Sequence, residues 1–232
     1  MANLQRLDQI LSSLGYCSRR EAKDWIKKGR VRHLDNCALK TSLKVDPHQI
    51  LIDDEPLDHP QGLLVLLNKP AGFVCSHESR EGSTVYELLP PRWLNRNPRI
   101  ETIGRLDKDT TGVLLFTDQG PINHRWTSPK HHVDKRYHVT TDLPISKELI
   151  PEFASGNLLL DGESKTCRPA ALSLISENTA HLSLVEGKFH QVKRMFEHFG
   201  LTVTRLHRES FGQYVLHDLD EGKFQIVPIP EL

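Results

Sequence analysis

The sequence has no apolar stretch long enough to cross a membrane and no apolar segment of signal-peptide length near its start. Internal repeats and low-complexity segments are absent, and the formal net charge is zero. None of its four cysteines belongs to a Cys-x-x-Cys pair; they are Cys17, Cys37, Cys75 and Cys167. This scatter argues against a disulfide framework and against a thiolate zinc site. Together these absences predict a globular protein of the reducing cytoplasm.

The zero net charge hides an uneven distribution along the chain. Residues 1–44 contain ten Lys and Arg against four Asp and Glu, whereas residues 45–58 contain five acidic residues and no basic one. A basic module that ends in an acidic connector can bind phosphate although the whole chain is neutral. The connector continues with two prolines and a glycine to residue 62. We therefore expect a small domain at 1–60 and a larger one at 61–232.

The small domain is predicted to begin with two short helices. Leucines at 4, 7, 11 and 14 would share one helix face, and Gly15 would end that helix. Ser18 and Glu21 have the spacing of a capping box, which predicts the start of a second helix that ends near Gly29. Short strands are expected at 31–34 and 49–52. The lysines and arginines of these helices could either bind a polyanion or merely solvate a helix face.

This order of elements resembles the S4 RNA-binding domain over residues 4–52. The family often has Val-x-Val-Asn-Gly after its second helix, and here the turn is altered to Val-Arg-His-Leu-Asp-Asn at 31–36. The resemblance implies that six side chains contact an RNA backbone: Arg6, Ser18, Arg19, Arg20, Lys27 and Arg30.

The larger domain combines many short strand candidates with a few helices and shows no regular alternation of the two. That pattern predicts an α+β fold with a mixed, mainly antiparallel sheet. Its central stretch runs from Gly104 to Gly112 and leads directly into the apolar run 113–117, which is typical of a buried strand. A loop on such a rigid support can hold a reactive carboxylate, and Asp107 is the candidate.

Three other interpretations of this stretch are weaker. A calcium loop fits the spacing of Asp107, Asp109 and Asp118, but position 12 is not Glu and a strand follows where a helix is needed. A zinc site lacks any His-Glu-x-x-His or similar ligand set, despite thirteen histidines. A pair of hydrolytic carboxylates is disfavoured because Arg105 favours the charged form of its neighbours, which suits a nucleophile or base and not a general acid.

Two basic runs in the larger domain are typical of nucleic-acid binding. The run 124–138 contains one acidic residue and includes Tyr137, whose ring could stack on a base or simply pack in the core. The run 188–194 lies at the start of a helix, where cations oppose the helix dipole. An RNA phosphate or a catalytic carboxylate would compensate that charge.

Four motifs, in this order, resemble those of the small-subunit (RsuA-type) branch of the pseudouridine synthases. They are Asn68-Lys69-Pro70, Gly104-Arg105-Leu106-Asp107-x-Asp109-Thr110-x-Gly112, Lys135-x-Tyr137 and Glu186-Gly187-Lys188-x-His190-Gln191-Val192-Lys193-Arg194-Met195. With the S4-like start, the resemblance covers nearly the whole chain. The segment 124–132 and the lack of a long basic C-terminal tail point to the 16S rRNA enzymes within this family.

The resemblance implies a catalytic role for three residues. Asp107 would be the nucleophile or base, acting at either C1′ or C2′ of the ribose. Tyr137 would stack on the extruded uracil and help to remove the C5 proton, and Lys193 would pair with Asp107. Arg105 would bind phosphate or fill the gap left by the flipped nucleotide. Further RNA contacts are expected from Lys69, Lys135, His190 and Arg194, although Lys69 could also be an ordinary turn lysine.

The expected activity is isomerisation of one 16S rRNA uridine by a cytoplasmic monomer that needs no metal or organic cofactor. The substrate would be free rRNA or a small-subunit assembly intermediate. Two alternatives stay open: a 23S rRNA synthase of the same family, and an RNA-binding assembly factor without catalysis.

Overall fold

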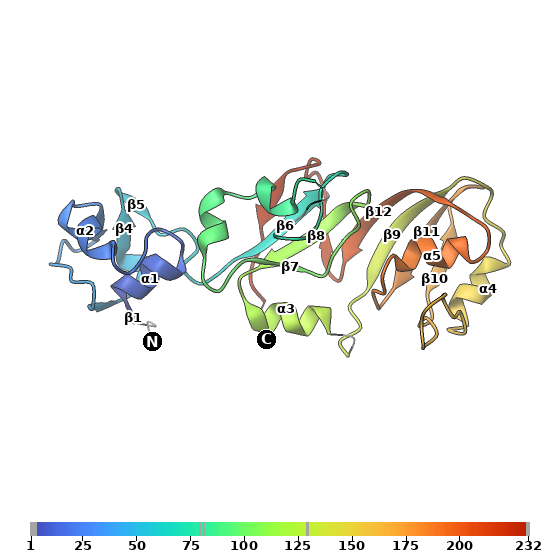
Figure 1. Ribbon diagram of the computed structural model, residues 1–232, viewed down its shortest axis with the longest axis horizontal. Coiled ribbons are helices and arrows are strands. Elements are labelled where there is room, and N and C mark those ends of the chain that lie inside the picture. The colour runs from blue at the N-terminus through green and yellow to red at the C-terminus, as the bar shows by residue number, and fades with distance from the viewer. Residues whose placement is uncertain (1–3, 79, 81, 129, 231–232) are drawn as a thin grey trace.

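The computed structural model describes residues 4–78, 80, 82–128 and 130–230. The molecule is elongated, with a small N-terminal unit at one end and a long sheet that occupies the rest (Figure 1). Hydrophobic side chains between Leu7 and Leu57 form one core, and the core residues from Leu63 onward form two others. Among the described residues, no helix is long and apolar enough to cross a membrane.

The small unit contains two helices and two small antiparallel sheets. Helices α1 (Leu7–Ser13) and α2 (Ala22–Lys27) share a core with β2 (Val31–His33), β3 (Lys44–Val45) and β4 (Ile50–Ile52). Strand β1 (Gln5–Arg6) pairs with β3, and β5 (Glu55–Pro56) pairs with β4. The two strands predicted at 31–34 and 49–52 are confirmed as β2 and β4, which pair antiparallel. The first helix begins at Leu7, so Leu4 lies outside it and is exposed.

The capping box at the start of the second helix is confirmed. The Ser18 backbone N–H donates to Glu21 Oε2 over 2.8 Å, and the Glu21 N–H donates to Ser18 Oγ over 3.3 Å. The regular helix α2 nevertheless begins at Ala22, later than predicted, because residues 19–21 form a turn. Arg19 and Arg20 therefore lie on this exposed turn and not on the helix itself.

The large sheet has the strand order β10-β11-β9-β12-β8-β6-β14, with β7 and β13 added at β8 and β12. Its named strands are β6 (Leu64–Lys69), β7 (Glu101–Ile103), β8 (Thr111–Thr117), β9 (Lys135–Thr141), β10 (Ala171–Leu174), β11 (Thr179–Leu184), β12 (Val203–Phe211), β13 (Tyr214–Val215) and β14 (Phe224–Ile226). Strands β12 and β8 pair in parallel, and the other named pairs of this sheet are antiparallel. The predicted α+β class with a mixed, mainly antiparallel sheet is confirmed.

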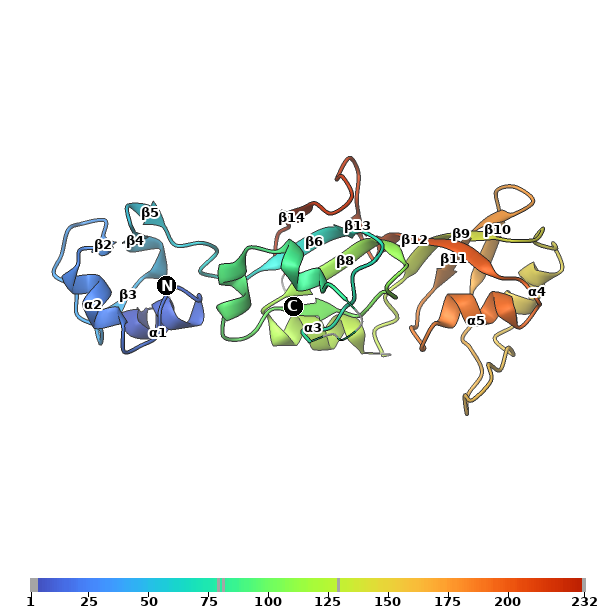
Figure 2. The same cartoon turned by 45° about the horizontal axis from the view of Figure 1, so that its top comes forward.

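Short helices cover the faces of this sheet (Figure 2). Alternate residues of β6 and β8 are buried on opposite faces, so the central runs 64–67 and 113–116 are apolar at every position. Helix α3 (Gly120–Thr127) packs Ile122 on one face. The other face is covered by four short helices: α4 (Leu149–Ala154), α5 (Gln191–Glu197) and the 3-10 helices η2 (Val85–Leu88) and η3 (Pro91–Asn95). The remaining 3-10 helix of the described residues, η1 (Pro47–Gln49), belongs to the small unit.

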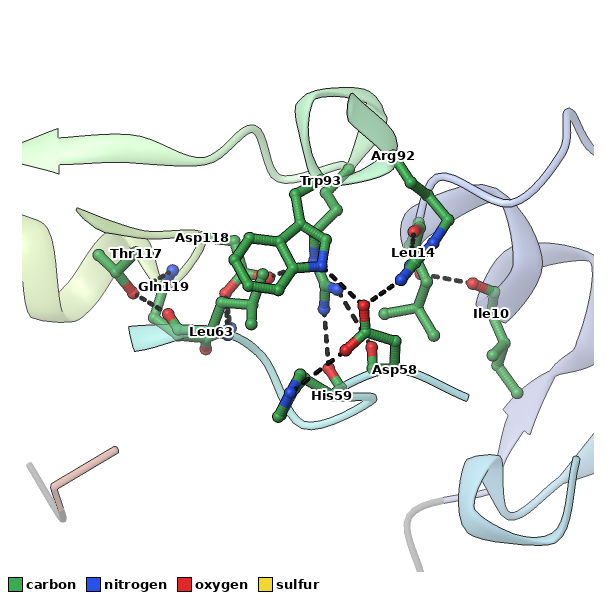
Figure 3. A network of polar contacts seen from close by, with 12 residues as sticks. Ile10, Leu14, Asp58, His59, Leu63, Arg92, Trp93, Thr117, Asp118 and Gln119 are labelled. Atoms are coloured by element: carbon green, nitrogen blue, oxygen red, sulfur yellow. Dashed lines mark hydrogen bonds and ion pairs between the residues drawn. The ribbon is translucent and has the colours of Figure 1, made fainter. Parts of the chain in front are cut away.

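The acidic connector makes hydrogen bonds to both the small unit and the larger domain at the point where the two meet (Figure 3). The Asp58 carboxylate accepts hydrogen bonds from the Arg92 guanidinium and, over 2.7 Å, from Trp93 Nε1. Burial opposes ionisation of Asp58, but these donors outweigh it and lower the pKa of the carboxyl. Across the junction, the Asp58 N–H donates to the Tyr16 hydroxyl over 2.9 Å. The connector is therefore a structured joint between the two parts.

Candidate active site

The loop between β7 and β8 carries the candidate nucleophile. Gly104 and Gly112 bracket the loop with φ angles of +70° and +105°, which L side chains rarely adopt. A Cβ at Gly112 would also lie 2.3 Å from the Arg208 carbonyl oxygen of β12. Glycine at 112 thus permits the close parallel pairing of β8 with β12, and this pairing fixes the end of the loop.

Lys69 supports this loop from the protein interior and is not accessible to RNA. Its side chain is fully buried, and Nζ donates to the carbonyl oxygens of Pro70, Lys108 and Thr110 over 2.9, 3.2 and 2.8 Å. Burial lowers the pKa of this lysine. All three ammonium donors are used within the protein, so the expected RNA contact of Lys69 is wrong. Its function is to hold the backbone around Asp107.

Asp107 lies opposite the start of α5. Its Oδ1 is 3.5 Å from His190 Nε2, and its Oδ2 is 3.5 Å from Lys193 Nζ. Lys193 is shared, because Nζ also contacts both Asp109 carboxylate oxygens at 2.5 and 2.8 Å. The structure thus brings the three sequence-predicted residues Asp107, His190 and Lys193 together.

Buried side chains of α5 explain how those cations are held in place. Val192, Met195 and Phe196 are buried in the core beneath the sheet, so the opposite helix face, with Lys193, turns toward the loop. His190 directly precedes the helix with φ +46°, a left-handed conformation that is uncommon for histidine. Its ring stacks on the exposed Phe189 ring, with the centroids 3.8 Å apart.

A cleft of about 890 Å³ opens beside Asp107. The loop 104–110 forms one wall and residues 184–192 form another. Side chains of β9 and β12 also line it: Lys135, Tyr137, Leu206, Arg208 and Phe211. Tyr137 is almost fully buried, and it lies in β9 with Leu182 on one side and Arg208 on the other as its cross-strand partners. A cleft of this size can take a nucleotide.

Two other predicted RNA-binding residues of this domain differ in their surroundings. Arg105 is exposed and lines the cleft, as an RNA-binding arginine should. Arg194 instead turns toward residues 161–163, where it donates to Glu163 Oε1 over 3.1 Å and to the Asp161 carbonyl oxygen. It also donates to the Phe189 carbonyl oxygen over 3.0 Å. These contacts are all within the protein, so the RNA contact of Arg194 stays a prediction and would require it to exchange one of them.

The basic residues of the small unit are partly neutralised by carboxylates. Arg6 and Arg19 both contact Asp8, at 2.9 and 3.1 Å, and the hydrogen bond from Arg6 lowers the pKa of Asp8 to about 2. Arg30 pairs with Asp53 and lies over the Trp25 ring. The other candidates, Arg20 and Lys27, are exposed, and Ser18 is in the capping box.

One residue of the cleft was missed by the sequence analysis. Arg208 lies in β12 on the same face as Leu206, so it occupies a core position in the alternating pattern of the strand. This alternation is the signal that could have found it, because an arginine at a buried strand position needs a polar partner. In the described part of the chain, no three His, Cys, Asp or Glu residues gather as metal ligands.

Comparison with known proteins agrees with this geometry. Residues 63–198 match the family described as RNA pseudouridylate synthase, and residues 5–33 match the S4 domain. The chain is 37% identical over 225 residues to the ribosomal small subunit pseudouridine synthase A of Escherichia coli (strain K12), covering 95% of each chain. It is 38% identical over 234 residues to the protein of that name from Vibrio parahaemolyticus, covering 98% of this chain and 97% of that one.

A crystal structure of a pseudouridylate synthase is also similar, with a TM-score of 0.67, 33% identity and coverage of 96% of both chains. The family matches and the relatives together span nearly the whole sequence, which confirms both resemblances found from its motifs. The chain therefore belongs to the RNA pseudouridylate synthase family and carries an S4 domain ahead of its catalytic domain.

Proposed function

We propose that this pseudouridine synthase isomerises a uridine of small-subunit (16S) rRNA and that Asp107 is its nucleophile or base. The observation that supports the chemistry is the position of Asp107 in a nucleotide-sized cleft, opposite Lys193 and His190. The observation that supports the substrate is the name shared by the curated relatives. The catalytic domain would comprise residues 61–232, and the S4 domain residues 1–60.

The reaction breaks the C1′–N1 bond of uridine, turns the uracil and joins its C5 to C1′. Asp107 would attack C1′ or remove a proton at C2′, and in either case the negative charge it starts with is balanced by Lys193. Tyr137 would form the platform on which the extruded uracil stacks, and its hydroxyl would help to remove the C5 proton. Lys193 holds Asp109 more closely than Asp107, so Asp109 fixes the position of this shared cation.

The target base must leave its stack to enter the cleft, which costs a few kcal/mol. Phosphate contacts would offset that cost, from Arg105 and His190 around the cleft and from Arg6, Ser18, Arg19, Arg20, Lys27 and Arg30 of the S4 domain, while Lys135 would contact the nucleotide inside the cleft. The enzyme would act as a monomer in the cytoplasm, on free rRNA or on an assembly intermediate of the small subunit.

Mapping of pseudouridine in both large rRNAs tests the proposed substrate. A strain that lacks the gene should lose one pseudouridine from 16S rRNA and keep every pseudouridine of 23S rRNA. Expression of the wild-type protein should restore the missing site, whereas the Asp107→Asn variant should not. Loss in 23S rRNA alone would overturn the choice of substrate and leave the activity intact.

Replacement of Arg19 and Arg20 by Gln should weaken RNA binding and reduce its dependence on salt. Both residues lie on the exposed turn before α2, and removal of each phosphate-binding side chain should lower the salt slope by about one. Binding measured between 50 and 200 mM salt, roughly the range where such interactions dominate, gives that slope. Lys147→Gln is the control and should leave the slope unchanged, because this exposed lysine directly precedes Glu148 and α4. Helix α4 lies at the opposite end of the molecule from the small unit (Figure 1). An unaltered slope in the double variant would reject this RNA-binding surface.

A further inference from the structure

Arg208 is a buried cation without a carboxylate partner among the described residues. Only 1% of the residue is exposed, and its Nε donates to the Val113 carbonyl oxygen over 2.7 Å. Its Nη2 is buried and has no hydrogen-bond partner in the described part of the chain. A guanidinium in this state is costly, because a buried charge normally needs both a counter-charge and partners for its N–H groups. Since Arg208 lines the cleft, a ligand in the cleft can supply what the protein does not.

The neighbours of Arg208 in the cleft include Tyr137, the proposed platform for the uracil. In the sheet register, Arg208 of β12 lies directly across from Tyr137 of β9, and Phe211 lies across from Lys135. Lys135 and Tyr137 are two residues apart in one strand, so their side chains share a face. The Arg208 Cζ and the Lys135 Nζ are each 5.3 Å from the centroid of the Phe211 ring.

The charge of Arg208 acts on Lys135. Burial lowers the pKa of Lys135 to about 8, and the positive charge of Arg208 contributes in the same direction. Lys135 Nζ donates to the Val133 carbonyl oxygen over 2.8 Å, which is a neutral acceptor. Two cations therefore lie near the Phe211 ring in the lining of the cleft, and a ligand oxygen that carries negative charge would stabilise both.

A second polar atom at the cleft is also without a partner. The Thr110 hydroxyl is buried, lines the cleft and makes no hydrogen bond to the described residues. Thr110 belongs to the same loop as Asp107, and its backbone N–H donates to the Asp107 carbonyl oxygen over 3.1 Å. Arg208 and Thr110 thus each bring a buried polar atom without a hydrogen-bond partner to the lining of the same cleft. This arrangement indicates that a polar ligand binds there.

We propose that Arg208, backed by Lys135, binds a carbonyl oxygen of the target uracil and stabilises the negative charge that develops on the ring. This assignment rests on the proposed function of the cleft. When the C1′–N1 bond breaks, its electron pair remains on the uracil and spreads over O2 and O4. The pair returns when C5 forms its bond to C1′, after which the C5 proton leaves and N1 takes up a proton. A donor fixed at one of these oxygens therefore lowers the barrier to bond cleavage.

A base is a better occupant than a phosphate for geometric reasons. Arg208 is almost inaccessible from outside, and its cross-strand neighbour is the tyrosine on which the uracil would stack. The base is the part of an extruded nucleotide that enters deepest, whereas the phosphates stay near the surface. Exposed cations such as Arg105 are better placed for the backbone.

Single-turnover kinetics with Arg208→Met test the assignment. The substrate is an RNA fragment that contains the uridine found by rRNA mapping, with a normal uridine, 2-thiouridine or 4-thiouridine at the target. We expect Arg208→Met to slow isomerisation of bound RNA about 100-fold, with the Kd within about threefold of wild type. Sulfur is a poor acceptor, so one of the two thio substitutions should slow the wild type and leave the variant unaffected. The sensitive position identifies the oxygen, O2 or O4.

Arg205→Met is the matched control, because Arg205 lies in the same strand but is exposed. It should behave as wild type with all three RNAs. Circular dichroism and thermal denaturation check the fold; if Arg208→Met does not fold, Arg208→Lys replaces it, since lysine keeps the charge but removes Nη2.

Two results would overturn the proposal. One is equal slowing of wild type and variant by both thio substitutions. The other is a weaker Kd with a salt slope reduced by about one and an unchanged rate for bound RNA, which would identify a phosphate contact. An enzyme that modifies a uridine outside 16S rRNA would overturn the proposed substrate only, because the Arg208 test then uses that uridine.

Discussion

Asp107→Asn should abolish isomerisation, lowering the single-turnover rate by at least about 10⁴-fold. Asparagine has nearly the same shape as aspartate, but its amide can neither attack C1′ nor remove a proton at C2′. The loop should keep its conformation, because Lys69 holds the backbone just after this residue, at Lys108 and Thr110, and does not touch the side chain. The measurement is the rate of pseudouridine formation in the rRNA identified by mapping.

RNA binding separates catalysis from recognition in this variant. Asp107→Asn should bind the same RNA within about tenfold of wild type, since phosphate contacts provide most of the affinity. Asp109→Asn is the control, because Asp109 contacts the same lysine but is mostly exposed. It should retain measurable activity. A normal rate in Asp107→Asn would remove Asp107 from the catalytic role. No pseudouridine formation by the wild type itself would instead favour the RNA-binding assembly factor without catalysis.

Local patterns allowed the two domains and much of the site to be predicted. Three of these features depend only on residues that are close in sequence: the capping box at Ser18, the apolar strand after Gly112 and the helix at 191–197. For the strand and the helix, the spacing of the apolar residues predicts which face is buried. The Asp107 loop and α5 contact each other across more than 80 residues. Only the resemblance between motifs, and no periodicity, predicted that contact.

The partners of individual charged side chains could not be predicted. Lys69 and Arg194 were expected to bind RNA because lysine and arginine are the usual phosphate ligands. Whether their donors are free depends on the residues that folding brings near them, such as Thr110 and Glu163, which lie 41 and 31 positions away. In the S4 domain, Asp8 likewise contacts Arg19 from a separate segment. An RNA phosphate that binds Arg19 must therefore either displace Asp8 or bind the guanidinium together with it.

A mutation at the domain junction should cause a large loss of stability, because a buried ion pair fixes the end of the connector there. Arg96 Nε donates to Asp118 Oδ2 over 2.8 Å, and their side chains are 1% and 5% exposed. The Arg96 guanidinium also donates to the carbonyl oxygens of Asp58 and His59, while Asp118 Oδ1 accepts from the Leu63 N–H over 2.8 Å. Figure 3 shows Asp118 near Trp93, which binds Asp58, so the residues around this ion pair tie the connector to the catalytic core.

Asp118→Asn should reduce the free energy of unfolding by about 3–5 kcal/mol. Its amide oxygen can still accept from the Leu63 N–H, but its NH₂ group then faces the Arg96 guanidinium and leaves a buried charge unpaired. Urea denaturation followed by tryptophan fluorescence measures the loss, since Trp93 lies at this junction. Asp218→Asn, an exposed carboxylate, is the control and should change stability by less than about 0.5 kcal/mol.

Removal of both charges distinguishes the ion pair from general damage to the site. If the unpaired arginine causes the loss, Arg96→Met combined with Asp118→Asn should cost clearly less than the sum of the two single changes, because no buried charge is then left alone. Costs that add without coupling would show that Asp118 acts through its bond to Leu63 and not through Arg96. In that case the connector would be held by its backbone, and the orientation of the S4 domain would not depend on the pair.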